Sequence, residues 1–415
     1  MRHRRRPALA TIVLVLPLAA SAPAAADETS HFLSPSHFQL RPNLYGTQLR
    51  DRADALPLTR ATVGDIMNDL NRRNETTPVK LGGICAPSAV QPGTRVNVAR
   101  SVCFNKGDNA TTEWYPQGVT TGGHARGGPI LVSWYHRAAK GVRISFVNPD
   151  TGAYRHVLLV YPRANGDYVT VRASQDKSSP NYNRSLHGGG ILWYGNHLFV
   201  ADTDRGFRMF DMRRIYDLGA SRNGTTRHKD RVGLIDGTYY GHGYRYVMPQ
   251  VGSWTRTAAP GTKCSTSNGT PRFSYVSLDR GHGHLVAGEY CEARRPSKGR
   301  VAVWPIAHAF DARNELITDP SHRWNPVAVH KLPDSNIQGA ARINGRWYLS
   351  RSRGTFTAGT LYTTEPATSS TRTLKVARRQ ALPIGPEDLS PSQGNTIWTV
   401  AEHPGKRTLY AVRPN

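Results

Sequence analysis

The chain has 415 residues, 38% of them hydrophobic, and a formal net charge of +25, so it is long enough to bury a large core. The charge favours anionic partners such as nucleic acid, wall polymers or acidic polysaccharide, although a genome rich in arginine codons explains the same excess. The sequence has no Cys/His zinc pattern, basic helix or ribonucleoprotein motif, which argues against a specific nucleic-acid-binding protein.

Residues 1–26 are typical of a secretory signal peptide. Four arginines in Met1–Pro7 precede the apolar run Ala8–Ala20, and Ala24-Ala25-Ala26 offers a small-residue cleavage site before Asp27. The apolar run is too short to span a bilayer stably, and no later stretch is longer. Loss of four arginines and no acid leaves a mature charge of about +21. We therefore expect an extracellular protein without a membrane span.

The mature chain contains four cysteines. An even number in an exported protein indicates two disulfides, and we expect Cys85–Cys103 and Cys264–Cys291, each closing a short loop. Their spacing does not fit a zinc site, and an oxidising compartment argues against a cysteine nucleophile.

The N-terminal region, residues 27–112, precedes the main domain, residues 113–415. Residues 27–60 are polar and contain proline, so we expect an extended arm. Thr62 is a candidate N-cap for a helix through Asn74, with Ile66, Met67 and Leu70 on one face. Residues 75–112 are rich in loop-forming residues and contain the first cysteine pair.

The clearest stretch of the main domain is residues 187–212. Strands are predicted at Gly188–Trp193, Leu198–Ala201 and Phe207–Met212. They are separated by the turns Tyr194-Gly195-Asn196 and Asp202–Gly206, which indicates an antiparallel meander.

Weaker copies of this unit recur along the chain. The five copies open at residues 117, 187, 273, 338 and 387, and a second polar cluster follows each opening by about 15 residues. This recurrence predicts an all-β propeller with five recognisable blades, five to seven being possible, closed by an N-terminal strand near Arg95–Val102. Residues 238–256 could be a sixth blade or an outer excursion of the second. A β-sandwich of short strands is the competing architecture.

The propeller fold indicates where a site would lie. In each blade the start of the innermost strand and the turn between the second and third strands face the same end of the central channel. The predicted inner ring is Gln117, His187, Ser274, Gln338 and Glu387. The second ring is His136, Asp202, Asp204, Arg205, Glu289, Tyr290, Arg351, Arg353, Glu402 and His403.

The candidate roles follow from residue chemistry. His187 precedes three glycines that would let a ligand approach the backbone, and His124 lies in a glycine-rich loop. The catalytic candidates are His187, His124, Tyr240, His242 and Arg205. The substrate-binding candidates are Gln117, His136, Asp202, Tyr290, Gln338, Arg351, Glu387 and His403.

Several of these residues have structural alternatives. Gln117 and Gln338 could hold the channel together by hydrogen bonds, and Asp202 could cap a turn. Glu387, in Pro-Glu-Asp-Leu, could help to hold a Ca²⁺ in the central channel or orient a neighbour. No other metal or cofactor is expected.

The residue types favour β-elimination on a uronate. Arginine pairs with the carboxylate, a His or Tyr removes the neighbouring proton, and a second His or Tyr protonates the leaving oxygen. The sequence contains neither Gly-x-Ser-x-Gly nor His-Glu-x-x-His. A two-carboxylate glycosidase built from Glu387 with Glu289 or Glu402 stays open.

The blocks WYPQGVTT, KGVRISFV, HGGGILWYGNHLFVADT and PEDLS resemble a family of exported actinobacterial and fungal β-propellers, and the resemblance spans Trp114 to the C-terminus. The family includes factor C-like extracellular signalling proteins. It is also similar to lyases that remove terminal rhamnose from glucuronate on arabinogalactan side chains, which implies a propeller with His, Tyr and Arg at the site. No residue of this sequence is assigned a role by the resemblance.

We therefore expect an exported, monomeric, carbohydrate-active propeller. The favoured activity is that of a polysaccharide lyase on a glucuronate linkage of an acidic plant glycan. A non-catalytic extracellular signalling or binding protein and a propeller glycoside hydrolase are the alternatives.

Overall fold

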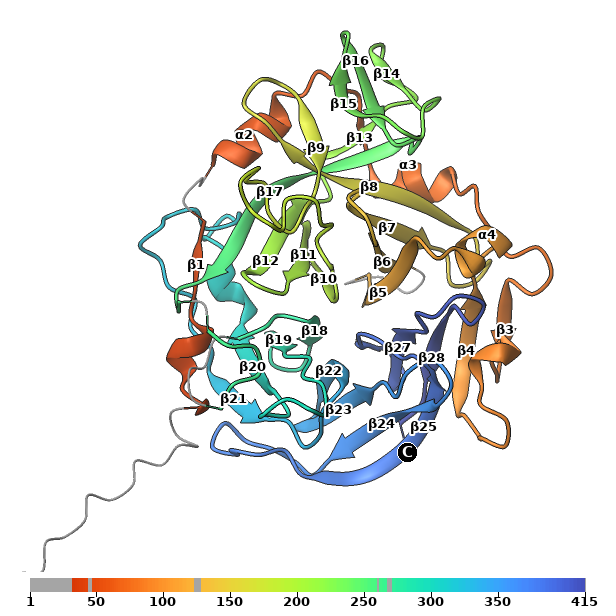
Figure 1. Ribbon diagram of the computed structural model, residues 1–415, viewed down its shortest axis with the longest axis vertical. Coiled ribbons are helices and arrows are strands. Elements are labelled where there is room, and N and C mark those ends of the chain that lie inside the picture. Colours follow the sequence, from red (N-terminus) through yellow and green to blue (C-terminus); the bar gives the residue numbers. More distant parts are fainter. Residues whose placement is uncertain (1–31, 44–46, 123–127, 260, 267–270, 415) are drawn as a thin grey trace, which may run out of the picture.

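The computed structural model describes residues 32–43, 47–122, 128–259, 261–266 and 271–414, so the expected signal peptide lies outside the described residues. The described strands form five antiparallel units of four strands around a central axis (Figure 1), which confirms the predicted β-propeller. In each unit the first strand lies innermost, and the inner strands of the units pack on one another.

The strands are numbered in chain order, and each unit is described from its innermost strand outward. Unit 1 comprises β5 (Trp114–Thr121), β6 (Ile130–His136), β7 (Val142–Val147) and β8 (Tyr154–Pro162), and unit 2 comprises β10 (Ile191–Tyr194), β11 (His197–Asp202), β12 (Gly206–Asp211) and β17 (Tyr246–Arg256). Unit 3 comprises β18 (Tyr275–Asp279), β19 (His284–Gly288), β20 (Arg300–Pro305) and β21 (Ala328–Lys331), and unit 4 comprises β22 (Ile337–Ile343), β23 (Arg346–Arg351), β24 (Ala358–Thr364) and β25 (Val376–Ile384). Unit 5 comprises β26 (Ser390–Ser392), β27 (Thr396–Val400), β28 (Thr408–Val412) and β4 (Val98–Cys103).

The ring is closed by a strand from the N-terminal region. β4 pairs antiparallel with β28, from Thr408 opposite Cys103 to Val412 opposite Val98, and β3 (Val79–Leu81) extends the sheet by one more strand. The strand expected at 95–102 therefore exists, shifted toward the C-terminus by a few residues. Closure covers the strand edge of unit 5 that would otherwise be free to pair with another chain.

Units 1 and 2 are joined at their outer edges. β17 pairs in parallel with β8, so that Tyr246 lies opposite Val157, and β9 (Tyr168–Thr170) pairs with β8. The chain between β12 and β17 leaves the ring as an excursion, drawn at the top of Figure 1. Its strands are β13 (Ile215–Asp217), β14 (Gly224–Thr225), β15 (Val232–Ile235) and β16 (Thr238–Gly241). Residues 238–256 therefore supply part of this excursion and the outer strand of unit 2, rather than a sixth blade.

The N-terminal region is more structured than an extended arm. Its elements are η1 (Pro35–Phe38), β1 (Leu40–Pro42), α2 (Gln48–Asp54), β2 (Arg60–Ala61), α3 (Val63–Asn68), η2 (Pro87–Ala89) and α4 (Lys106–Ala110); η3 (Ile306–Ala309) lies in unit 3. β1 adds to the outer edge of unit 2 by pairing with β17, and β2 pairs with β13. The prediction of a simple arm was therefore wrong, because this segment covers the outer strand of unit 2.

Thr62 caps α3 as expected. Its hydroxyl accepts a hydrogen bond from the Asp65 amide at 3.1 Å, and the Asp65 carboxylate accepts one from the Thr62 amide at 2.8 Å. The helix nevertheless ends at Asn68 rather than Asn74. The chain beyond it pairs with unit 1 instead, where Arg72 and Tyr154 exchange two backbone hydrogen bonds of 3.1 and 2.8 Å.

The core lies between adjacent units and is rich in aromatic side chains. Trp304, Trp324, Phe207 and Phe273 form one cluster between units 2 and 3, with ring centroids 5.2 to 6.4 Å apart for the contacting pairs. Each such side chain buried contributes about 1.5–3 kcal/mol through removal of apolar surface from water. This packing fixes the positions of the strand ends that carry the polar residues.

Both expected disulfides are present. Cys85–Cys103 ties the end of β4 to the preceding loop, and Cys264–Cys291 joins two loops of unit 3, each with a Cα–Cα distance of 5.9 Å. Among the described residues, no helix has the length and apolar character needed to cross a membrane.

Candidate functional site

The inner strands come into backbone contact at the axis. A Cβ on Gly118 would lie 2.7 Å from the Ile191 nitrogen, and one on Gly190 would lie 2.3 Å from the Val276 nitrogen. A Cβ on Gly339 would lie 2.8 Å from the Cα of Asp388. Only glycine allows strands of different units to approach this closely. The axis is therefore closed at this level, and the expected channel is a hollow above it.

Asp388 holds the closed level together. Its Oδ2 accepts backbone hydrogen bonds from Val119 at 3.4 Å and Ile191 at 3.2 Å, so a side chain of unit 5 binds the inner strands of units 1 and 2. The side chain is fully buried. Burial raises the pKa of Asp388 well above its ordinary value, and these backbone N–H groups oppose that shift.

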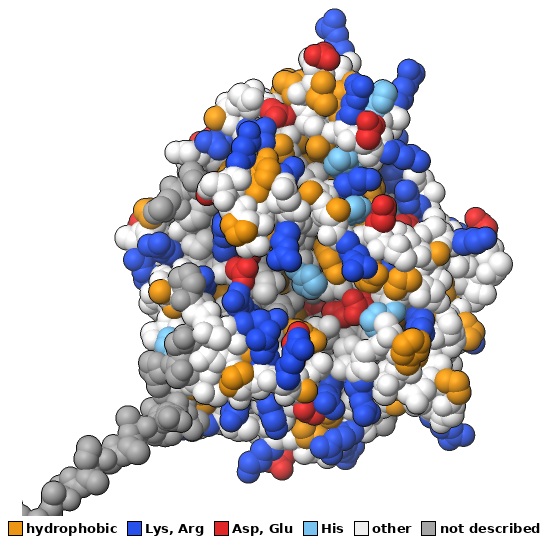
Figure 2. Space-filling view, in the orientation of Figure 1, with side chains coloured by type: hydrophobic (Ala, Val, Ile, Leu, Met, Phe, Trp, Pro, Cys, Tyr) orange, Lys and Arg blue, Asp and Glu red, His pale blue; other side chains and the backbone are white. Residues whose placement is uncertain are grey.

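Six polar or aromatic side chains gather near the starts of the inner strands, and we call this group the mouth: Gln117, Tyr135, His187, Gln338, Glu387 and Glu402. Figure 2 shows acidic side chains at the centre of this face, next to histidines and surrounded by lysines and arginines. The Gln117 amide donates to Glu402 at 3.1 Å, and the Gln338 amide donates to Glu387 at 3.0 Å. Two carboxyl groups from unit 5 thus face two amide donors from units 1 and 4.

Glu387 and Glu402 form a hydrogen-bonded carboxyl pair. Burial, and then the negative charge of Glu402, raise the pKa of Glu387 well above its ordinary value. Protonation of Glu387 removes the repulsion between the two carboxyl groups, so the mouth presents an uncharged Glu387 beside Glu402.

His187 and Tyr135 lie next to this pair. Their ring centroids are 4.6 Å apart, and both line a cavity of about 360 Å³ between units 1 and 2, the mouth cavity. Arg137, Arg184 and Asp202 line the same cavity. The His187 side chain is exposed to this cavity, while Tyr135 is half-buried. A ligand in the mouth cavity would therefore contact a histidine, a tyrosine and two arginines at once.

The protonation states of these two rings are set by their surroundings. Desolvation by the surrounding protein lowers the pKa of His187, and the positive charge of Lys263 lowers it further. The imidazole is therefore neutral at neutral pH. Desolvation, and then the carboxyl groups of Glu402 and Glu387, raise the pKa of Tyr135 to about 12. His187 is thus available as a proton acceptor and Tyr135 as a proton donor.

Most predicted substrate-binding residues lie in or beside the mouth. Gln117, Gln338 and Glu387 form its lower part, as described above. Tyr290 is close enough to Glu387 and Glu402 for their charges to raise its pKa, after the larger effects of burial and Glu292. The Nδ1 of His403 lies 3.7 Å from a Glu402 oxygen, and His136 and Asp202 line the mouth cavity.

His187 does not hold the inner-ring position expected for unit 2. That position belongs to Gly189, where a Cβ would lie 2.2 Å from the Ser274 carbonyl oxygen. A side chain there would collide with unit 3; the histidine stands two residues earlier, where its ring contacts that of Tyr135.

Other predicted residues lie elsewhere. Tyr240 is in the peripheral excursion, with its hydroxyl 3.5 Å from Arg231, and His242 contacts the Lys229 carbonyl there. Arg351 is bound to Asp334 at 3.2 Å and to Ser335. His124 lies outside the described residues. Tyr240 and His242 thus lie away from the mouth, whereas Arg351, opposite Ile337, lies at the same end of unit 4 as Gln338.

Two further predicted residues have other environments. Glu289 accepts hydrogen bonds from Nε and Nη2 of Arg300, at 2.8 and 3.0 Å. Both side chains are buried, so this carboxylate is part of the core. Arg205 is in the β11–β12 turn, where its Nη2 lies 3.5 Å from Ser174 Oγ, and it lines a second cavity beside the mouth cavity.

Tyr135 is the mouth residue that sequence reasoning missed. It immediately precedes the polar cluster His136-Arg137 in the sequence. Its position at the end of β6, beside a predicted second-ring residue, was the available signal. Lys263, which lies 5.6 Å over the Tyr290 ring, carried no comparable signal in the sequence.

The residues of the mouth fit a protonated Glu387 better than the Ca²⁺ that was one alternative for this residue. As the side chains lie, Gln117 and Gln338 direct N–H groups, not oxygens, at the two carboxyl groups. Calcium requires six to eight oxygen ligands, which this arrangement does not supply.

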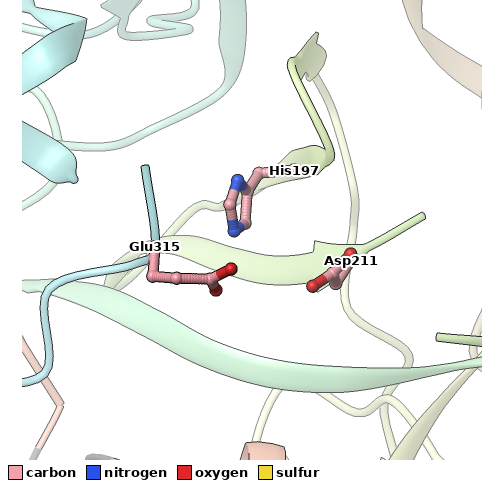
Figure 3. Close-up of side chains that lie close together, drawn as sticks. All are labelled: His197, Asp211 and Glu315. Atoms are coloured by element: carbon pink, nitrogen blue, oxygen red, sulfur yellow. The ribbon is translucent and has the colours of Figure 1, made fainter. Parts of the chain in front are cut away.

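A second group of possible metal ligands lies away from the mouth. His197 of β11, Asp211 of β12 and Glu315 point toward one another (Figure 3), with ligand atoms within 4.8 Å. Arg213 donates to Asp211 at 2.8 Å and to Glu315 at 2.8 Å, and Arg214 also binds Asp211. Two guanidinium groups already neutralise these carboxylates, so the group is an ion-pair network.

No protein-family model and no curated protein matches the chain. Among solved structures, the chain is similar to the PQQ-bound aldose sugar dehydrogenase from Streptomyces coelicolor, at 14% identity and a TM-score of 0.31, with 78% of this chain and 99% of that chain covered. It is also similar to a GH43_1 enzyme from Xanthomonas citri, at 10% identity and a TM-score of 0.34, with 73% and 90% covered. A third is the RS223-Beta-xylosidase, at 10% identity and a TM-score of 0.32, with 72% and 92% covered. Likenesses at these scores carry no argument about function.

Proposed function

We propose that this protein is an exported carbohydrate-active propeller that cleaves a uronate linkage of an acidic plant glycan by β-elimination. The observation that carries the proposal is the contact between a neutral His187 and a protonated Tyr135 in a cavity that also contains two arginines. These are the groups that proton abstraction next to a carboxylate requires.

Each residue has one role in the proposed step. Arg137 and Arg184 pair with the uronate carboxylate and make the C5–H bond more acidic. His187 takes the C5 proton, the electrons of that bond form the C4–C5 double bond, and the C4–O bond breaks. Tyr135 donates its proton to the departing oxygen. The products are an unsaturated uronate and a free hydroxyl group, with no water consumed.

The carboxyl pair argues against hydrolysis as the activity of the mouth. Glycosidases keep their two carboxyl groups about 5 Å apart in retaining enzymes and more in inverting ones. Glu387 and Glu402 are instead hydrogen-bonded to each other, and Glu289 is committed to Arg300. Glu402, the partly exposed member of the pair, is better suited to accept hydrogen bonds from sugar hydroxyl groups.

The test is the ultraviolet absorbance of the unsaturated uronate, followed while the protein is incubated with gum arabic and other acidic glycans. We expect absorbance to rise with the wild type. Loss of an acid or base typically costs about 10²–10⁴-fold in rate, so His187→Ala and Tyr135→Phe should each lose at least about 100-fold. His308→Ala, at an exposed site on η3, is the matched control and should keep full activity.

Different outcomes separate the alternatives. New reducing ends without absorbance would indicate a hydrolase, and binding without any cleavage across the panel would indicate a non-catalytic binding protein. Full activity of His187→Ala would remove His187 as the base.

A further inference from the structure

A larger cavity lies directly beside the mouth cavity, and we call it the outer cavity. Its volume is about 610 Å³, and it lies between the ends of β8 and β17 and the β11–β12 turn. Asp202 lines both cavities, and the segment 173–174 runs between them, with Ala173 on the mouth side and Ser174 on the outer side. The two cavities are therefore neighbours on one face of the propeller.

The outer cavity is lined by four arginines and two aspartates. The arginines are Arg41, Arg163, Arg205 and Arg208, and the aspartates are Asp176 and Asp202. Asp176 uses its Oδ1 to hold the amide and hydroxyl of Ser178, at 2.9 and 2.7 Å. Asp202 is engaged by Arg208. The lining thus carries more positive than negative charge.

Arg208 supplies the strongest indication of a ligand. This side chain is only 5% exposed, and its Nε donates to Asp202 Oδ2 at 2.7 Å. Its Nη2 is also buried and finds no hydrogen-bond partner among the described residues. A buried charged donor left without an acceptor is costly, whereas a guanidinium that meets an anionic oxygen forms a strong, directional contact. Arg208 lines the outer cavity, so an anionic oxygen bound there could serve as the missing acceptor.

We propose that the outer cavity binds a carboxylate of the same acidic glycan whose neighbouring residue occupies the mouth cavity. The identity of this ligand rests on the proposed function. The volume falls in the range of small-ligand sites, and Arg41, Arg205 and Arg208 provide the donors. Arg205, predicted from the sequence as a catalytic residue, is here a binding residue.

The test compares two double variants that remove the same charge. Arg41→Gln with Arg205→Gln changes the outer cavity, and Arg313→Gln with Arg378→Gln changes exposed positions in unit 3 and on β25. Binding of a galacturonate tetrasaccharide and of gum arabic is measured by calorimetry, with the carboxyl-reduced tetrasaccharide as a neutral probe. We expect the first pair to weaken binding of at least one acidic probe about tenfold or more and the second pair to change it less than about twofold.

A third variant, Arg208→Lys, keeps the charge beside Asp202 but removes the free Nη2. We expect it to keep the thermal transition of the wild type and to bind the acidic probe at least about threefold more weakly. Binding of wild-type strength by this folded variant would contradict the role given to Nη2.

The outcomes separate this proposal from the proposed function. Weaker binding in the first pair, with no elimination on any glycan, would uphold the anion site and reject the lyase. Elimination by the wild type with unchanged affinity and KM in the first pair would reject the anion site and uphold the lyase. Equal losses in both pairs, or binding of the carboxyl-reduced tetrasaccharide as tight as that of the galacturonate tetrasaccharide, would overturn the anion site.

Discussion

At the scale of the residue, Glu387 shows how the mouth differs from the surrounding core. Its carboxyl group is fully buried, faces Glu402 and receives one amide hydrogen bond from Gln338. Because its pKa is raised in the folded protein, the folded state binds this proton more tightly than the unfolded chain does. Stability should therefore fall as the pH rises from the ordinary pKa of 4.5 toward the raised value.

Glu387→Gln should stabilise the protein at about pH 8. Glutamine can donate to Glu402 as the protonated acid does, and it cannot ionise. Each unit of upward pKa shift corresponds to about 1.4 kcal/mol, so we expect a gain of at least about 1 kcal/mol in the free energy of unfolding. Denaturant titrations at about pH 4 and pH 8 measure it. The gain should vanish at the lower pH, and a destabilised variant at the higher pH would contradict the raised pKa.

His187 makes a prediction of the opposite sign for activity. A base must be unprotonated to act, so kcat/KM should be lost as the pH falls through the pKa of His187, which lies below the ordinary 6.5. The high pKa of Tyr135 keeps the acid protonated, so no loss is expected up to about pH 9. Measuring kcat/KM as a function of pH on any cleaved glycan tests both expectations. An acid limb centred above pH 6.5 would contradict the neutral histidine.

At the scale of the element, the ends of the inner strands are fixed by one another. Asp388, on the approach to β26, accepts hydrogen bonds from the amide of Val119 within β5 and from that of Ile191 at the start of β10. Asp388→Ala leaves these buried N–H groups without an acceptor and opens a cavity, which should cost about 2–5 kcal/mol. Asp388→Asn keeps an acceptor oxygen and should cost less than about 1 kcal/mol. Thermal unfolding of the two variants measures both losses of stability. Equal losses would show that the hydrogen bonds to these backbone amides do not stabilise the fold.

The elements also show what could be predicted from the sequence. The turns around 187–212 and the recurring polar openings predicted the strands and the closing strand, because these features depend on local pattern. The even number of cysteines predicted the two disulfides. The helices α2 and α4 were missed, since each has seven residues or fewer and owes its stability to packing on the ring.

The site was predicted in part for a related reason. The openings indicate the height of Gln117, Gln338 and Glu387 along the axis, and the structure brings these three together. A repeat pattern does not say which side chains of different units touch. The contact of Tyr135 with His187, and that of Glu387 with Glu402, depend on how far each strand lies from the axis.

At the scale of the whole molecule, the ring depends on its N-terminal closing strand. A chain that begins after Cys103 would lack β3 and β4 and expose the edge of β28. We expect that chain to form oligomers or to lose its cooperative thermal transition, because an exposed edge pairs with other chains. A chain beginning at residue 32 is the control. A monomer with a transition within about 5 °C of the control would contradict the role of the closing strand.

The central claim is that the mouth breaks a glycan by elimination, and the source of the oxygen at the new chain end tests it most directly. The protein is incubated with gum arabic in water enriched in the heavy oxygen isotope, and the masses of the products are measured by mass spectrometry. Elimination predicts an unsaturated uronate product, with no solvent oxygen in either fragment. Incorporation of the heavy isotope into a saturated product would contradict the account and identify a hydrolase.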